Sequence, residues 1–255
     1  MNQVALMSYL LTGNWGTRSE VGVILPTYQE SENIGKLIAE IENLPLNTSI
    51  LVIDDSSPDK TAEIVKTLQK NCGNIVLCVR PRKSGFGTAI TDGFKIFLSL
   101  KTPPRFIVTM DADYSHDPKA IPQLLSSMQS RCGIVIGSRY CNGGKIVGWP
   151  FTRKIISRTA NIVAKSLLDL KLDDCTSGFR CYSTRFLKVS LGSLHSQTYE
   201  IQIETVNQAL SKGFGVKETP ILFVNRKRGK SKLTLTEVQS YVSYVFKAAV
   251  FGRNR

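Results

Sequence analysis

The stretch FIVTMDADYSHDPKAIPQLLSSM, residues 106–128, places an apolar run, an acidic loop and a helical pattern in immediate succession. Phe106–Met110 is short and mostly apolar, as expected of a strand buried on both faces. Asp117 and Pro118 predict a helix start, because aspartate caps helix N-termini and proline fits the first turn. Apolar residues then recur at helical spacing, namely Ile121, Leu124, Leu125 and Met128. The stretch is therefore a strand–loop–helix unit.

The same unit recurs along the chain. Further strands are predicted by the apolar runs 21–25, 50–53, 75–79 and 133–137. The first run is followed by apolar residues at helical spacing, and Ser57-Pro58 predicts a helix start after the second, with Ser57 as the cap. Strands that alternate with helices predict an α/β fold with a mainly parallel, doubly wound sheet flanked by helices.

The last third of the chain is less regular. Its patterns predict helices near 152–168 and 199–212, a strand near 216–224 and an amphipathic stretch at 234–251. We see no internal repeat and no low-complexity linker. We therefore expect a tail over 1–19, one α/β domain over 20–233 and an amphipathic C-terminal extension over 234–255.

Composition indicates a globular protein with anionic partners. Of the 255 residues, 42% are hydrophobic, and 33 Lys and Arg outnumber 20 Asp and Glu, which gives a net charge of +13. Such an excess favours nucleic acid, phosphorylated substrates or an anionic membrane face. The six cysteines form no CxxC pair, which points to a reducing compartment and against a disulfide frame or a zinc site. No apolar run of about 18 residues predicts a membrane span, and the N-terminus lacks a signal-peptide pattern.

Polar clusters follow four of the predicted strands. They are PTYQE at 26–30, DDSSPD at 54–59, DADYS at 111–115 and GSRY at 137–140. A single cluster of this kind is often only a helix cap. Because ligands of an open parallel sheet bind beyond the carboxyl ends of its strands, four clusters at one edge predict a functional site there.

The chemistry of this edge favours a metal and excludes a dinucleotide cofactor. The turn after the first strand has no glycine, the pair Gly85 and Gly87 comes only after the third, and no P-loop is present, so a nicotinamide cofactor is rejected. Asp111 and Asp113 leave their strand at alternate positions and can point the same way. Crowded carboxylates are costly unless a cation neutralises them, and oxygen ligands suit a hard divalent ion. Solvated loop charges are the alternative interpretation.

Nine motifs in order then resemble family 2 glycosyltransferases of the GT-A fold. Six are general to that family, namely VGVILPTYQESENI (21–34), LVIDDSSPDKT (51–61), GFGTAITDGF (85–94), VTMDADYSHDP (108–118), IGSRY (136–140) and DDCTSGFRCY (173–182). Three more narrow the resemblance to dolichyl- or polyprenyl-phosphate mannose synthases, namely RKIISRTAN (153–161), YEIQIE (199–204) and FVNRKRGKSKL (223–233). The resemblance covers about Val21 to Leu233 and is greatest to soluble, single-domain members.

The resemblance implies a donor-binding half. The nucleotide-sugar would contact the turns after the first four strands and the basic segment near 226–232. By position these residues are Pro26, Tyr28, Glu30, Asp54, Asp55, Lys83, Gly87, Ala112, Arg226 and Lys232. The family's DxD motif matches 111–113, which implies that Asp111 and Asp113 ligate Mg²⁺ or Mn²⁺. Ser115 stands where the family often carries glutamine and is the third candidate ligand.

The resemblance also implies an acceptor half. Arg139, Arg153 and Ser157 match positions that bind the lipid phosphate, and arginine's planar fork suits phosphate oxygens. A further acceptor-side motif supplies Asp174, Ser177 and Arg180, and Glu204 on the next helix is interpreted as structural. The residues expected to act in catalysis are Asp111, Asp113, Arg139 and Arg226.

The reaction implied by the resemblance is inverting transfer of mannose from GDP-mannose to dolichyl or polyprenyl phosphate, as in a dolichyl-phosphate β-D-mannosyltransferase. The nucleophile is a phosphate oxygen, and a phosphate monoester has a second pKa of about 6, so it needs positioning more than deprotonation. Neither His116 nor His195 is therefore needed as a base. The nearest rival is a polyprenyl-phosphate glucosyltransferase that uses UDP-glucose.

Two rivals come from other classes, a nucleic-acid-binding protein and a non-catalytic partner subunit. The basic residues lack the interleaved aromatics of a stacking platform, so no nucleic-acid partner is expected. The intact acids and arginines argue against a non-catalytic subunit. We expect a peripheral protein at the cytoplasmic face of a membrane, docked through residues 238–255 and the basic residues 226–232. The alternatives for the C-terminal helix are packing on the catalytic domain or on a small membrane-anchoring subunit.

Overall fold

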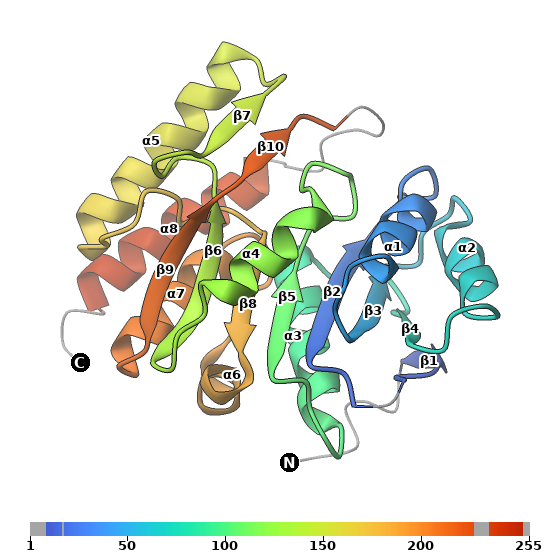
Figure 1. Ribbon diagram of the computed structural model, residues 1–255. Helices are drawn as coiled ribbons and strands as arrows, with labels where there is room; N and C mark the ends of the chain where they lie inside the picture. Colours follow the sequence, from blue (N-terminus) through green and yellow to red (C-terminus); the bar gives the residue numbers. More distant parts are fainter. Residues whose placement is uncertain (1–8, 17, 227–234, 252–255) are drawn as a thin grey trace.

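An eight-stranded sheet crosses the molecule in the computed structural model, which describes residues 9–16, 18–226 and 235–251 (Figure 1). The strand order is β1-β4-β3-β2-β5-β8-β6-β9. The strands are β1 Leu10–Gly13, β2 Val21–Thr27, β3 Thr48–Asp54, β4 Ile75–Val79, β5 Phe106–Thr109, β6 Cys132–Ser138, β8 Arg180–Ser183 and β9 Gly215–Pro220. A separate pair consists of β7 Lys145–Val147 and β10 Leu222–Val224, which run parallel.

Helices cover both faces of the sheet. They are α1 Ile34–Glu42, α2 Thr61–Leu68, α3 Phe86–Ser99, α4 Ile121–Ser126, α5 Phe151–Leu168, α6 Thr184–Ser190, α7 Ile201–Ser211 and α8 Leu235–Phe251. Alternate residues of each central strand enter opposite core layers. In β3, Leu51 and Ile53 belong to the core layer that also contains α3 and α7, whereas Ile50 and Val52 belong to the layer that contains α1 and α4. Burial on both faces explains why the strand sequences are continuously apolar.

The parallel strands bring the polar clusters to one edge, as predicted. Thr27 of β2 is level with Asp54 of β3, and Thr109 of β5 is level with Ile24 of β2. The mainly parallel α/β sheet expected from the sequence is therefore present. Two strands depart from it, because β1 runs antiparallel at the edge and β8 lies antiparallel between β5 and β6. β1 lies within the stretch predicted as an N-terminal tail.

Two local predictions have opposite outcomes. Asp117 accepts a hydrogen bond from the Lys119 N–H at 2.9 Å, which confirms the cap that precedes the turn leading into α4. The prediction that Ser57 caps α2 is wrong, because α2 begins at Thr61. Both the amide and the hydroxyl of Ser57 donate to Asp54 instead, so this serine closes the turn after β3.

The predicted strand near 216–224 is two strands with different partners. β9 pairs with β6 in the main sheet, whereas β10 leaves that sheet and pairs with β7. β10 then reaches the acidic loop, where the Val224 N–H donates to the Ser115 carbonyl at 3.1 Å. This path carries the chain to Arg226, beside the carboxyl ends of the central strands.

The C-terminal helix α8 packs along α5, and the two helices lie side by side in Figure 1. The Tyr241 hydroxyl donates to the Ala160 carbonyl at 3.3 Å, and Val245 is buried. The amphipathic face predicted from the sequence is therefore divided. Val242, Phe246 and Val250 are exposed, while Tyr241 and Val245 face inward.

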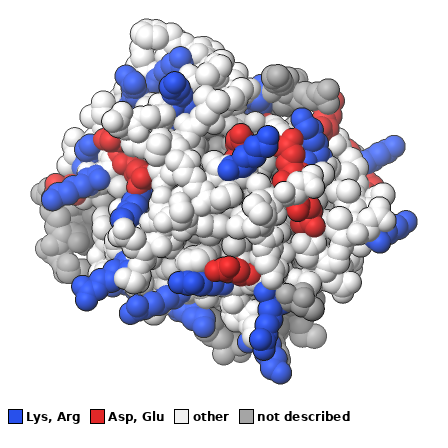
Figure 2. All heavy atoms as spheres, viewed as in Figure 1, with Lys and Arg blue, Asp and Glu red and all other residues white. Residues whose placement is uncertain are grey.

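The described helices and the charge on one face of the surface bear on the predictions of no membrane span and of anionic partners. Among the described residues, no helix combines the length and apolar character needed to cross a bilayer. On the face drawn in Figure 2, Lys and Arg side chains are dispersed between uncharged areas. All six cysteines are free.

Candidate active site

The acidic loop after β5 holds its two carboxylates in different surroundings. Asp113 is buried, receives the Ser115 N–H at 3.0 Å and lies 2.8 Å from an Arg226 guanidinium nitrogen. The Asp111 side chain is about one-third exposed at 32%, and its backbone N–H donates to His116 Nδ1 at 3.3 Å. The sequence-predicted pair Asp111 and Asp113, together with Arg226, is thus brought together.

In this loop nearby positive charge stabilises the ionised form of Asp113 more than that of Asp111. Burial and the negative charge of Asp113 raise the pKa of Asp111 above its ordinary value. Burial also acts to raise the pKa of Asp113, but the Arg226 charge outweighs it and holds that pKa below the ordinary value. Burial lowers the pKa of His116, so its imidazole is neutral and can accept from the Asp111 amide.

These residues fit a divalent cation shared with a substrate. The Ser115 hydroxyl is buried and makes no hydrogen bond to any residue that the structure describes. Two carboxylates and a hydroxyl are oxygen ligands of the kind that Mg²⁺ and Mn²⁺ take, and a cation would relieve the crowding that raises the pKa of Asp111. No cluster of three His, Cys, Asp or Glu side chains that could hold a metal lies within the described ranges. Substrate oxygens would therefore complete such a site.

A first cavity opens over the carboxyl ends of β2, β3 and β5. Most of the predicted donor-binding residues line it, namely Pro26, Tyr28, Glu30, Asp55, Lys83, Ala112 and Arg226, together with Asp111 and Asp113. The Lys83 ammonium lies 4.7 Å from the centre of the Tyr28 ring, and Glu30 accepts from the Asn33 amide at 2.9 Å.

Among the described residues, two predicted donor residues do not line this cavity, namely Asp54 and Gly87. Asp54 accepts from the Thr27 hydroxyl at 2.9 Å and from Ser57, and is almost fully buried. Gly87 packs against the backbone of residues 196–198, where an added Cβ would come within 2.6 Å of two carbonyl oxygens. Lys232 lies outside the described residues. A donor role for these three stays a prediction.

Arg80 is a site-supporting residue that sequence reasoning missed. It is 1% exposed, and its Nε donates to Asp55 at 2.5 Å. Its other nitrogens reach the Gly85 carbonyl at 3.0 Å and the Thr88 hydroxyl at 2.8 Å. Arg80 thereby fixes both the acid that faces the cavity and the turn that carries Lys83. Its place at the end of β4, one residue beyond an apolar run, was the available signal.

A second cavity adjoins the first and combines aromatic and aliphatic side chains with several arginines. Trp149, Ile156 and Phe223 line it together with the three predicted acceptor residues Arg139, Arg153 and Ser157. The Arg153 guanidinium stacks over the Trp149 ring at 4.3 Å. Burial lowers the pKa of Arg153, and the neighbouring positive charges of Arg226 and Arg139 lower it further. An anion in this cavity would relieve that repulsion.

Asp174 fixes Arg139 in place. The two side chains form a bidentate pair at 2.7 and 2.8 Å, and Arg139 also donates to the Thr176 hydroxyl at 2.7 Å. Asp174 further accepts the backbone N–H groups of Thr176 and Ser177. The acid thus orders the loop before β8 as well as the arginine.

Arg180 supports the same loop from the protein interior. It is fully buried and donates to the carbonyls of Ser177, Gln202 and Cys175 at 2.7, 2.6 and 2.8 Å. It does not line either cavity. Its geometry is that of a support for the loop rather than of a ligand-contacting group.

The two cavities meet at four side chains. Asp111, Arg226, Phe86 and Tyr199 line both. The Phe86 and Tyr199 rings are stacked, with their centres 4.8 Å apart and an interplanar angle of 14°. Sequence reasoning did not single out either ring, because a single aromatic side chain carries no chemical pattern of its own. A ligand in one cavity can thus approach a ligand in the other.

Comparison with known sequences agrees with this geometry. The family model described as glycosyl transferase family 2 matches residues 22–191. The polyprenol monophosphomannose synthase of Mycolicibacterium smegmatis is 34% identical over 233 residues, which cover 91% of this chain and 87% of that protein. The undecaprenyl-phosphate mannosyltransferase of Micrococcus luteus is 34% identical over 83% of this chain and 86% of that protein. The chain therefore belongs to glycosyl transferase family 2.

Solved structures confirm the GT-A fold expected from the sequence. Glucosyl-3-phosphoglycerate synthase from Mycobacterium tuberculosis, solved with Mn²⁺ and UDP, matches with a TM-score of 0.64 at 16% identity, over 92% of this chain and 80% of that chain. A mannosyltransferase from Pyrobaculum calidifontis, solved with GDP-Man and Mn²⁺, matches with a TM-score of 0.56 at 17% identity, over 86% of this chain and 60% of that chain.

The Asp174–Arg139 pair predicts an acid-sensitive contribution to stability. Burial opposes ionisation, but Arg139 holds the pKa of Asp174 below its ordinary value in the folded protein. An unfolded aspartate has a pKa of about 3.9, so this contribution is complete above about pH 4 and is lost as pH falls through the folded pKa. The Asp174→Asn variant, which leaves Arg139 buried without its anion, should lose about 3 kcal/mol near neutral pH.

Urea unfolding at several pH values between about 2.5 and 7 measures this effect. Below about pH 4 the free energy of unfolding should fall less steeply for Asp174→Asn than for the wild type. Asp173→Asn is the matched control, because Asp173 is exposed and its carboxylate pairs with Lys165 at the surface. Parallel pH curves for wild type and Asp174→Asn would contradict the assignment.

Proposed function

We propose that the chain transfers mannose from GDP-mannose to the phosphate of a dolichyl or other polyprenyl phosphate, with inversion at the sugar. The observation that carries the proposal is the junction of two unlike cavities at Asp111 and Arg226. One cavity is lined by several charged side chains and lies at the carboxyl edge of the sheet, where nucleotides bind. The other combines arginines with apolar walls, which suits an amphiphile with an anionic head. The two mannosyltransferase relatives named above support the same reaction class.

The donor side of the proposal uses residues that already line the first cavity. Asp55, held by Arg80, is placed to accept hydrogen bonds from the guanine or the ribose. Tyr28 supplies a flat apolar surface, with the Lys83 charge above it. Arg226 lies at the junction and would pair with the diphosphate in addition to Asp113.

Asp111, Asp113 and the Ser115 hydroxyl would hold Mg²⁺ or Mn²⁺. A divalent ion at this place would supply positive charge to stabilise the leaving diphosphate. The protein's own part is to hold the two carboxylates at fixed positions, which it does through the Ser115 N–H, His116 and the end of β5. Solved relatives in this fold carry Mn²⁺, which supports a divalent ion.

The acceptor phosphate would enter beside Arg139 and Arg153, with Ser157 on the same helix as Arg153. A phosphate monoester has a second pKa of about 6 and is largely dianionic at neutral pH, so its oxygen is a ready nucleophile that needs placement. The buried Trp149 indole N–H donates no hydrogen bond to any described residue, and Trp149 lines the same cavity. It adds a neutral donor where an anion is expected. The isoprenoid chain would follow the apolar wall.

The helices α5 and α8 would place this cavity at the cytoplasmic face of a membrane. Large apolar side chains of both helices are exposed, namely Phe151, Ile155, Ile156, Ile162, Val163 and Leu167 on α5 and Val242, Phe246 and Val250 on α8. α5 also lines the acceptor cavity through Arg153, Ile156 and Ser157. An apolar surface of this size favours a lipid or protein contact. A small membrane-anchoring subunit is the alternative partner, and the basic segment 227–232 and the C-terminal arginines lie outside the described residues.

A donor screen tests the proposed reaction. Purified protein is given a polyprenyl phosphate, Mg²⁺ or Mn²⁺, and GDP-mannose or UDP-glucose, and the lipid product is measured. We expect mannosyl lipid from GDP-mannose. Product from UDP-glucose alone would assign the chain to the glucosyltransferase alternative, and no lipid product from either donor would refute the proposal.

The Asp113→Ala variant tests the metal assignment. Turnover should fall by about a thousandfold or more, because the change removes a proposed ligand and leaves Arg226 without its carboxylate. Glu63→Ala, an exposed acid in the first turn of α2, is the control and should keep full activity. Near-wild-type transfer by folded Asp113→Ala with Mg²⁺ or Mn²⁺ present would show that the assignment is wrong.

The Arg153→Ala variant tests the acceptor site. The KM for polyprenyl phosphate should rise about tenfold or more while the KM for GDP-mannose changes little, because one charged hydrogen-bond donor to the phosphate is lost. Arg153→Lys should restore little, since lysine lacks the planar fork. Arg158→Ala is the matched control, because Arg158 lies on the same helix but does not line the cavity. Equal small effects from Arg153→Ala and Arg158→Ala would favour a surface-charge role for Arg153.

Liposome flotation tests the membrane contact. The full-length protein should float with vesicles that contain anionic lipid, and a Phe151→Ser/Phe246→Ser variant should float less, because each loses an exposed apolar side chain. Val189→Ser, which removes an exposed apolar side chain on α6, is the control. A wild type that does not float would leave a partner subunit as the anchor.

A further inference from the structure

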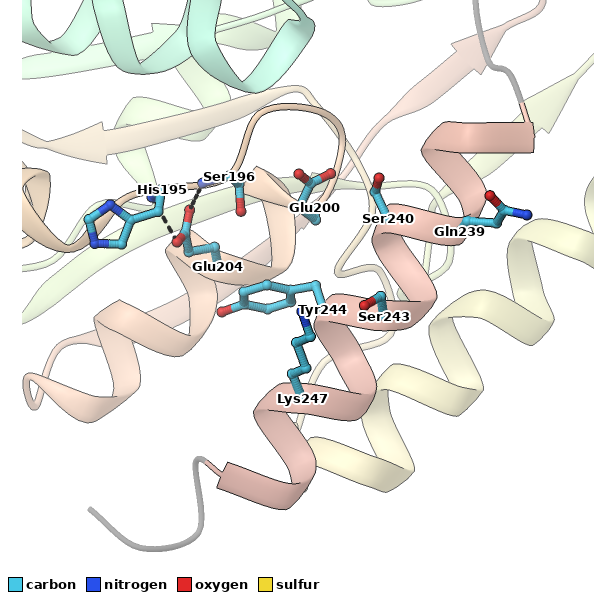
Figure 3. A pocket seen from close by; sticks show the side chains of 9 residues that line it. All are labelled: His195, Ser196, Glu200, Glu204, Gln239, Ser240, Ser243, Tyr244 and Lys247. Atoms are coloured by element: carbon cyan, nitrogen blue, oxygen red, sulfur yellow. Dashed lines mark hydrogen bonds between the residues drawn. The ribbon is translucent and has the colours of Figure 1, made fainter.

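The loop that precedes α7 is held by two carboxylates, that of Glu200 at the N-cap of the helix and that of Glu204 in its first turn. Glu204 accepts the backbone N–H groups of His195 and Ser196 at 2.9 and 3.0 Å, which Figure 3 shows as dashed lines. Glu200 accepts the next two, from Gln197 and Thr198, both at 3.0 Å. Four consecutive N–H groups are thus satisfied by two side chains one helical turn apart.

This arrangement is built to be rigid. Glu200 and Glu204 are 8% and 5% exposed, so their hydrogen bonds to the loop are shielded from water. Hydrogen bonds to an ionised carboxylate are stronger than those between neutral groups, and negative charge is favoured near a helix N-terminus. Figure 3 shows the Tyr244 ring of α8 close to Glu204. Burial raises the pKa of Tyr244 to about 12, so this neighbour stays neutral.

The loop in turn fixes the start of α3. The Gln197 carbonyl accepts the N–H groups of Gly87 and Thr88 at 2.9 and 3.3 Å, and so satisfies two amides of the first helical turn that have no partner within the helix. The contact is close, because a Cβ on Gly85 would lie 2.5 Å from the Gln197 oxygen. The glycine pair of the sequence is thus explained by this loop contact.

The loop also carries Tyr199 to the junction of the two cavities. Tyr199 follows directly after the four held amides, and its ring stacks on Phe86, the first residue of α3. Both rings line both cavities, next to Asp111 and Arg226. The place where sugar transfer would occur is therefore bounded by the Phe86 and Tyr199 rings. Their backbone segments are linked by the hydrogen bonds of the Gln197 carbonyl to the start of α3.

We propose that Glu204, assisted by Glu200, is a positioning residue for sugar transfer that acts through Tyr199. The two carboxylates fix residues 195–198, this backbone fixes the first turn of α3, and the Phe86–Tyr199 stack forms a wall at the reacting centre. The inference rests on the proposed function in taking the cavity junction as the place of transfer. It assigns to the YEIQIE motif (199–204) a role beyond the structural one.

A double-mutant cycle tests whether Glu204 acts through Tyr199. Glu204→Gln should lower kcat about tenfold to a hundredfold with less than about a threefold change in either KM, because a small misplacement at the reacting centre slows the chemical step. Tyr199→Leu should lower kcat similarly. In the Tyr199→Leu background, Glu204→Gln should lower kcat by less than about a further twofold, because the effects of coupled sites are not additive.

Glu42→Gln is the matched control for the carboxylate. Glu42 ends α1, accepts from the Asn74 amide at 2.8 Å and lines neither cavity. Its kcat should equal that of the wild type. If Glu204→Gln does not fold, Glu200→Gln takes its place in the cycle, since Glu200 holds the other two amides. Full additivity with Tyr199→Leu, or a change in thermal stability with kcat unchanged, would overturn the proposal.

Hydrogen exchange gives a readout that needs no substrate. In Glu204→Gln, exchange should accelerate both in peptides covering 195–202 and in those covering 84–92, because the Gly87 and Thr88 amides depend on Gln197. Acceleration confined to 195–202 would overturn the proposed coupling. If both peptides respond but the wild type transfers no mannose, the coupling stands and only the proposed reaction is refuted.

Discussion

The crowding of Asp111 and Asp113 at the end of β5 is the constraint around which the site is arranged. Two carboxylates at alternate positions cannot both ionise in a half-buried loop without nearby positive charge. Arg226 supplies part of it and stabilises Asp113, while the pKa of Asp111 stays raised. The remaining demand for positive charge is what a divalent ion bound with a diphosphate would meet.

The fold brings that positive charge from a distant part of the sequence. β10 leaves the main sheet, pairs with β7 and hydrogen-bonds to the acidic loop, which places Arg226 beside Asp113. Because β8 runs antiparallel between β5 and β6, its preceding loop reaches the same edge and fixes Arg139 through Asp174. The two cavities can then share one boundary.

The sequence predicted the parts of the site that have a chemical pattern. Asp111, Asp113, Arg139 and Arg153 were found because strand ends and family motifs mark them. Phe86 and Tyr199 were missed, because their significance is a stacking contact between the start of α3 and a loop more than a hundred residues away in the chain. Ser57 was misread as a cap for a related reason, since its hydroxyl prefers a nearby carboxylate that local pattern rules do not weigh. The divided face of α8 likewise depends on its packing against α5, which periodicity alone cannot reveal.

The most direct test of the account is a calorimetric titration of GDP-mannose into the protein with and without Mn²⁺. If the carboxylate pair is incomplete without a cation, Mn²⁺ should tighten donor binding at least about tenfold, and this gain should vanish when Asp111 and Asp113 are both replaced by asparagine. Donor affinity that is equal with and without Mn²⁺ or Mg²⁺ in the wild type would contradict the central claim.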